Sequence, residues 1–159
     1  MTMVQDLLRK AVFLALAAVL CLGASAAPAQ VAEPYSAGLL FLSLEKYDMA
    51  LQFFEQALAR NPKDAKAWFQ AGFCLGKLGD TEAKLRAYRK AIALDPKYAD
   101  AHYSLGVSLL LSGPKCDAVH ELRALTLLDA GLADKLRALM EAMMDADECE
   151  APPPPETAI

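Results

Sequence analysis

The hydrophobic and polar residues of this chain follow a helical pattern and not a strand-like one. No run alternates apolar and polar residues for long enough to indicate a β-strand, and Ala and Leu dominate the composition, which favours helices. The pattern predicts one helix over 65–77 and a second over 81–94, with Thr81 as the N-cap of the second. The turn between them lies at Gly79, and Pro96 follows the second helix because proline cannot continue it.

The N-terminal part of the chain has the layout of a secretory signal peptide. Two basic residues precede an uninterrupted apolar stretch over 11–23, and small residues follow it. Small residues at the A-x-A positions place the cleavage after Ala26 or Ala29, so we expect a signal peptide over 1–29 and an exported, periplasmic protein. The alternative is an uncleaved segment over 11–32 that anchors the protein in the inner membrane, the one membrane contact that the sequence suggests.

A self-similarity with a period of 34 residues organises the rest of the chain, and it aligns Gly38, Gly72 and Gly106. The period holds without insertion over three units, which span residues 31–64, 65–98 and 99–132. A glycine inside a helix costs about 1 kcal/mol relative to Ala. We therefore expect Gly72 to lie where the two helices of its unit meet, at a distance too short for a side chain.

The second unit resembles a tetratricopeptide repeat. Its matching residues are Trp68, Gly72, Gly79, Asp80, Tyr88, Ala91, Asp95 and Pro96. The first unit matches through Gly38, Phe41, Tyr47, Ala50, Phe54, Ala57 and Pro62, and the third, more weakly, through Leu105, Gly106, Ala118 and Leu122. The resemblance implies an all-α fold, a right-handed α-superhelix of three helix-turn-helix repeats followed by a C-terminal capping helix.

Lys84 departs from the family pattern, which has a small residue at this position, as the other units do with Ala50 and Ala118. Two interpretations stay open. The stem of Lys84 covers the helix contact and keeps its charge in water, or the helix is rotated so that Ala83 fills the position.

Beyond the repeats, apolar residues at helical spacing predict a capping helix over 133–146, which would cover the open face of the third unit. The cluster of Met140, Met143 and Met144 is interpreted as core filler, because methionine suits irregular gaps. Residues 147–159 are acidic and proline-rich, and we expect a disordered, solvated tail.

Nothing in the sequence favours catalysis. The histidines and cysteines lack metal-ligand spacing, no nucleophile and base suggest themselves, and no glycine-rich phosphate loop is present. His102 takes the place of Trp68 in the repeat, which is a packing position, and His120 is expected at the surface. We therefore expect no enzyme, no metal and no cofactor, and the lack of a basic run argues against nucleic acid as a partner.

Three cysteines remain after loss of the signal peptide. Cys116 precedes and Cys149 follows the hairpin of the last two helices, so both return to the same end of it, in a compartment that permits oxidation. Either these two form a disulfide that fixes the capping helix, or both are free thiols. Cys74 is expected to be a small buried apolar residue.

The resemblance also implies a concave groove, formed by the first helix of each repeat, that holds a segment of a partner protein. The positions that match the groove of the family are Tyr35, Leu39, Leu42, Ser43, Lys66, Phe69, Phe73, Gly76, Lys77, Asp100, Tyr103, Val107, Leu110 and Leu111. These are mostly apolar or aromatic, which suits an amphipathic helix or an extended apolar segment of another envelope protein. The alternatives are a homodimer or larger homo-oligomer that uses the groove as its own interface, and a tail or capping helix that covers it.

Overall fold

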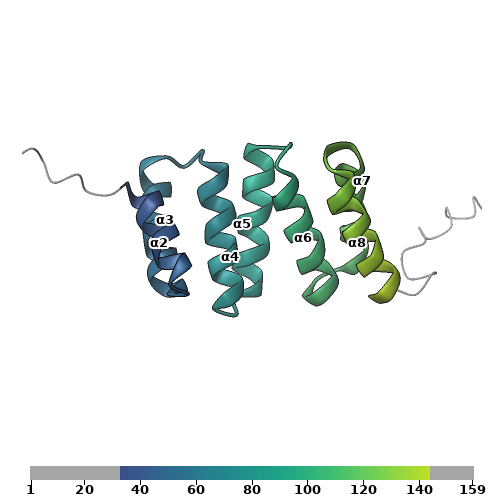
Figure 1. The fold of residues 1–159 in the computed structure, drawn as a ribbon, viewed down its shortest axis with the longest axis horizontal. Coiled ribbons are helices and arrows are strands. Elements are labelled where there is room, and N and C mark those ends of the chain that lie inside the picture. The colour runs from purple at the N-terminus through teal and green to yellow at the C-terminus, as the bar shows by residue number, and fades with distance from the viewer. Residues whose placement is uncertain (1–32, 144–159) are drawn as a thin grey trace, which may run out of the picture. The chain divides into compact units, whose positions relative to one another are not determined.

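The computed structural model describes residues 33–143, and within them every regular element is a helix (Figure 1). The predicted signal peptide and tail lie outside these residues. The helices in chain order are α2 (Pro34–Ser43), α3 (Tyr47–Arg60), α4 (Ala65–Lys77), α5 (Thr81–Leu94), α6 (Ala99–Ser112), the 3-10 helix η1 (Lys115–Asp117), α7 (Ala118–Leu128) and α8 (Ala130–Met143). None of these helices is long and apolar enough to span a bilayer.

The helices form antiparallel pairs, one in each of the three predicted units. α2 packs against α3, α4 against α5 and α6 against α7, while α3 also contacts α4 and α5 contacts α6. α8 packs against both helices of the third pair and is therefore the capping helix. The fold is an all-α repeat superhelix, and α4 and α5 have the bounds that the sequence predicted.

Aspartate side chains cap the helices of the second pair. Asp64 accepts hydrogen bonds from the backbone N–H groups of Lys66 and Ala67, both at 3.0 Å. Asp80 accepts one from Ala83 N at 2.9 Å, so the prediction of Thr81 as the N-cap is wrong: Thr81 is the first helical residue. Asp80 follows Gly79, whose φ of +87° provides the turn between α4 and α5.

The glycines of the repeat lie where the prediction places them, at helix contacts. A Cβ on Gly72 would lie 2.7 Å from the ring of Tyr88 and 3.2 Å from the Cβ of Ala87, both on α5. One on Gly76 would lie 2.8 Å from Cδ of Lys84. The aliphatic stem of Lys84 therefore lies over α4, which agrees with the first of the two interpretations.

Two groups of buried residues form the core. The first joins α3 and α4 around Phe54 and Cys74. The second joins α5 through α8 around Leu109, Leu125 and Leu136, with Met140 and Met143 packed against it as predicted. The third methionine of the predicted cluster, Met144, lies outside the described residues.

The capping helix begins earlier than predicted. The prediction was 133–146, whereas α8 begins at Ala130. The reason is a cap that the apolar periodicity does not register: Asp129 accepts a hydrogen bond from Leu132 N at 3.0 Å and starts the helix directly after α7. Residues 144–146 lie outside the described part of the chain.

Candidate functional site

A surface pocket of about 420 Å³ lies between the second and third helix pairs. α4, α5 and α6 supply its walls. The lining residues are Phe73, Gly76, Lys77, Lys84, Tyr88, Tyr103, Ser104, Val107, Ser108 and Leu111.

One face of α6 forms the apolar wall of the pocket. Tyr103, Val107 and Leu111 follow each other at intervals of four residues, so they lie one above the other on the same side of the helix. Phe73 faces them from the last turn but one of α4. Phe73 is 37% exposed and Leu111 is 66% exposed, so part of this apolar surface is in contact with solvent.

Two lysines give the pocket a positive charge. Nζ of Lys77 lies 5.4 Å from the ring centroid of Phe73 and 5.8 Å from that of Tyr47, within cation–π distance of both. The stem of Lys84 covers Gly76, the residue before Lys77. No carboxylate of residues 33–143 forms an ion pair with either ammonium group.

The pocket also contains hydroxyl groups, and one of them is hydrogen-bonded within α6. Ser108 Oγ donates to the carbonyl of Ser104 at 2.7 Å, one turn earlier on α6. Burial raises the pKa of Tyr88 to about 12, with a smaller contribution from Cys74, so its phenol stays neutral. The lysines are thus the charged groups that line the pocket.

The structure brings together part of the predicted groove. Phe73, Gly76, Lys77, Tyr103, Val107 and Leu111 line the pocket. Leu110 does not, and its prediction as a groove residue is wrong: it is 3% exposed and packs in the second core group. A helix turns by about 100° per residue, so the residue before Leu111 faces away from the pocket.

Seven further predicted groove residues lie outside the pocket. Tyr35 packs edge-on against Phe54, with ring centroids 5.6 Å apart, and Leu42 packs against the first core group. The ring of Phe69 lies 5.5 Å from that of Tyr88 and 5.0 Å from that of Tyr98. The other four are exposed: Leu39 and Ser43 on α2, Lys66 on α4 and Asp100 on α6.

Sequence reasoning missed four lining residues, namely Lys84, Tyr88, Ser104 and Ser108. The first two come from the second helix of their repeat, where the resemblance implied no groove. A signal existed for Lys84, since it replaces the small residue of the family pattern.

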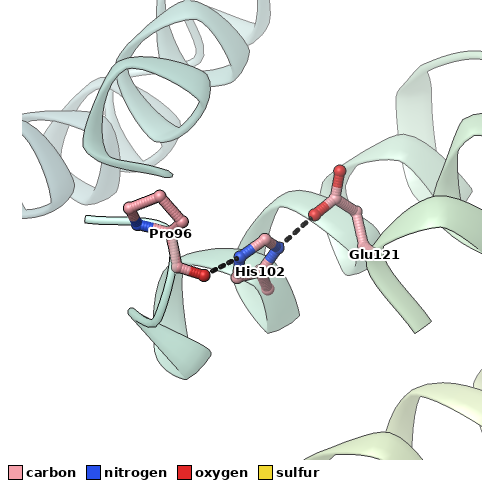
Figure 2. Close-up of polar contacts among 3 residues, drawn as sticks. All are labelled: Pro96, His102 and Glu121. Carbon is pink, nitrogen blue, oxygen red and sulfur yellow. Dashed lines mark hydrogen bonds and ion pairs between the residues drawn. The ribbon is translucent and has the colours of Figure 1, made fainter. Parts of the chain in front are cut away.

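His102 lies outside the pocket, at the packing position that the repeat predicted. Its ring is buried and has an acceptor on each side (Figure 2). Nδ1 lies 2.6 Å from Oε2 of Glu121, and Nε2 lies 3.1 Å from the carbonyl oxygen of Pro96. Since a carbonyl only accepts hydrogen bonds, Nε2 carries a proton and donates to Pro96. His120 is exposed on α7, as predicted.

The two cysteines within the described residues differ in oxidation state. Cys74 is buried and free, and burial raises the pKa of its thiol to about 11, which makes it a poor nucleophile at neutral pH. Cys116 is disulfide-bonded. Its predicted partner, Cys149, lies outside the described residues, so this pairing stays a prediction.

Three family models match the chain in overlapping stretches. One described as a TPR repeat matches residues 77–113, and two described as a tetratricopeptide repeat match residues 53–86 and 35–64. The chain is a tetratricopeptide repeat protein. No curated protein matches it in sequence.

Solved tetratricopeptide repeat structures share the fold. The TPR2B domain of yeast Sti1, in a complex with a pHsp70 peptide, is 19% identical with a TM-score of 0.66, covering 70% of this chain and 96% of that domain. The first TPR domain of Spaghetti (RPAP3), bound to the HSP90 peptide SRMEEVD, is 16% identical with a TM-score of 0.62, covering 69% and 91%. YrrB, described as having an unusual peptide-binding site, is 29% identical with a TM-score of 0.60, covering 66% of this chain and 55% of its own.

Proposed function

We propose that this tetratricopeptide repeat protein is a non-enzymatic interaction module of the cell envelope. In this proposal, the pocket between α4 and α6 binds a helix or an extended apolar segment of a partner protein. The observation that carries the proposal is an apolar wall, exposed to solvent and built from two repeats, at the place where the groove of the family is expected.

The size and lining of the pocket suit one or two apolar side chains. Its volume of about 420 Å³ lies within the range of ligand sites, and its lining is mostly apolar with a few polar groups. Burying one large apolar side chain contributes roughly 1.5–3 kcal/mol. Tyr103 and Phe73 are the expected anchors, because aromatic side chains provide a large contact area at low entropic cost.

Similar domains support a peptide as the partner. The Sti1 and Spaghetti domains were solved with peptides of Hsp70 and HSP90. The chemistry of the present pocket differs from a purely polar site, since the ammonium group of Lys77 lies over the ring of Phe73 and Lys84 lines the same pocket. We therefore expect an apolar segment that has an acidic residue close to its anchor.

The N-terminal sequence supports the location in the envelope. Its order of basic, apolar and small residues is that of a signal peptide over 1–29, so the partner would be exposed in the same compartment. If the segment over 11–32 is retained instead, the repeats are held at the inner membrane, and the partner is still an envelope protein.

Site-specific photocrosslinking in the cells that produce the protein tests this function. A photoreactive residue replaces Phe73, and a matched probe at Arg86, exposed on α5, serves as the control. We expect one discrete heavier product from the probe at Phe73 alone, which contains another envelope protein. A product that contains only a second copy of the chain would favour the homo-oligomer, and equal products from both sites would contradict a specific groove.

A further inference from the structure

We propose that the C-terminal segment 144–159, which is the predicted tail with the three residues before it and is called the tail from here on, docks in the pocket between α4 and α6 and competes there with the partner. This inference rests on the proposed function, because it makes the tail a regulator of the same site. The tail supplies the negative charge that the pocket lacks. It contains five carboxylates and four consecutive prolines, and no Lys or Arg: its acidic residues are Asp145, Asp147, Glu148, Glu150 and Glu156.

The acidic tail and the lysines of the pocket carry complementary charges. Lys77 and Lys84 have no ion-pair partner among residues 33–143, although an acidic partner would stabilise both. Glu150 and Glu156 flank the proline run on either side. When the prolines lie along the pocket, one of these carboxylates can approach the lysines at its edge.

The prolines of the tail also suit the aromatic surface of the pocket. Four consecutive prolines favour the extended polyproline II helix, which is already ordered before it binds. Such segments dock in grooves lined by aromatic rings. Phe73 and Tyr103 provide rings on opposite walls, with the exposed side chain of Leu111 beside them.

The described chain also ends near the pocket. Nζ of Lys115 donates to the carbonyl oxygen of Met143 at 3.0 Å, so the end of α8 lies beside η1, which follows α6. Figure 1 shows α4, α6 and α8 ending at the same edge of the repeats. The pocket lies near these ends, since it includes Lys77 in the last turn of α4 and Leu111 in the last turn of α6.

The tail is long enough to reach the pocket. From α8 to the space between α6 and α4 is about two helix spacings, or roughly 20 Å. The segment over 144–159 spans about 50 Å as a polyproline II helix, at about 3.1 Å per residue. If Cys116 pairs with Cys149 as predicted, the bridge holds the start of the proline segment near α6, which raises its effective concentration at the pocket.

Photocrosslinking of the purified full-length protein tests this inference, with mass spectrometry of the products. A photoreactive residue at Leu111 is the pocket probe, and one at Leu127, 86% exposed on α7, is the control. We expect the probe at Leu111 alone to form a product with residues 144–159 of the same chain. Its yield should not change on dilution, and a mixture of isotopically light and heavy chains should give no mixed product.

Charge reversal then tests the recognition. The pair Glu150→Lys and Glu156→Lys should lower the yield about fivefold, as should Lys77→Glu with Lys84→Glu, because each removes about 1 kcal/mol of ion pairing. Combining all four substitutions should restore the yield. Reversal of Lys63 and Lys97, which are exposed in turns, is the matched control and should leave the yield unchanged.

Two results would overturn the docking of the tail. One is the absence of any tail product while the probe at Leu111 reacts with neighbouring helices, and the other is a product that forms only between two chains. Both results are independent of the proposed function, which depends on the capture of another protein in cells. Capture of a partner without a tail product would leave the function standing and reject the tail.

Discussion

The second and third repeats differ in the side chains at two equivalent positions. One is the space over the glycine of the repeat, and the other is the position of Trp68 and His102. In the second repeat, the ring of Tyr88 from the same repeat fills the space over Gly72. In the third, the residue equivalent to Tyr88 is Leu122, and the side chain closest to the equivalent Gly106 is Leu136 from α8, at 2.7 Å from the position of a Cβ. At this glycine the third repeat therefore depends on the capping helix, whereas the second uses a side chain of its own.

The position of Trp68, which is His102 in the third repeat, shows the same contrast. Nε1 of Trp68 donates to the carbonyl of Pro62 at 3.0 Å, and Nε2 of His102 occupies the equivalent place against Pro96 at 3.1 Å. The imidazole preserves this hydrogen bond and uses its second nitrogen to contact Glu121 on α7. The third repeat thus replaces the apolar contact area of an indole with a polar link between its two helices.

The largest effect should come from Leu136→Ala. Leu136 is fully buried and joins α8 to the third repeat, so its truncation should lower the free energy of unfolding by about 2–5 kcal/mol. Urea denaturation followed by circular dichroism measures the change. The matched control is Leu127→Ala, at the exposed leucine of α7, and equal losses from the two variants would show that α8 does not complete the repeat.

Alkaline pH should distinguish the two side chains that pack over the glycines. Burial raises the pKa of Tyr88 from 10.0 to about 12, so its neutral form stabilises the fold below pH 10, and this contribution is lost as the pH rises to 12. The loss is on the order of 2–3 kcal/mol. Denaturation of Tyr88→Phe between pH 9 and 12 should show a smaller decline than the wild type, and an unchanged decline would assign the effect to other groups.

The contact between His102 and Glu121 should contribute less to the free energy of unfolding than the packing of Leu136 from the capping helix. Glu121→Ala leaves Nδ1 of a buried ring without its hydrogen-bond partner, which costs about 1–3 kcal/mol. Glu121→Gln keeps a polar partner and should recover part of the loss in the same denaturation measurement. Stability equal to the wild type in both variants would mean that the pair contributes no net stabilisation.

The smallest effect should come from the hydrogen bond of the indole. Trp68→Phe keeps most of the apolar area but removes the donor to Pro62, which lies at the surface, so a loss of about 0.5–1.5 kcal/mol is expected. The exposed His120→Ala is a suitable control. If Trp68→Phe costs more than Glu121→Ala, the two equivalent positions do not rank as their contacts suggest.

The helices were predictable from the sequence because the 34-residue period agrees with the positions of the turn residues. The spacing of Gly38, Gly72 and Gly106 fixes the helix contacts, and the prolines and Asp-containing turns end the helices. The caps were less predictable. Asp80 and not Thr81 caps α5, and one hydrogen bond from Leu132 N to Asp129 moves the start of α8 without any change in the apolar pattern.

The site was predictable only in part, for a geometric reason. Leu110 and Leu111 are adjacent in the sequence, and both are apolar. The rotation of α6 alone decides that Leu110 faces the core and Leu111 the pocket. Phe69 matches the groove pattern, yet its ring packs between Tyr88 and Tyr98. Which aromatic residues remain available to a partner depends on such contacts, and no periodicity contains them.

The pocket is shared by the second and third repeats, because α4, α5 and α6 all line it. The most direct test compares partner capture in cells by probes at Phe73, on α4, and at Leu111, on α6. Because both side chains line one pocket, we expect the two probes to crosslink the same partner protein, and through the same segment of it. Different partners, or capture from one repeat alone, would contradict a single binding site between α4 and α6.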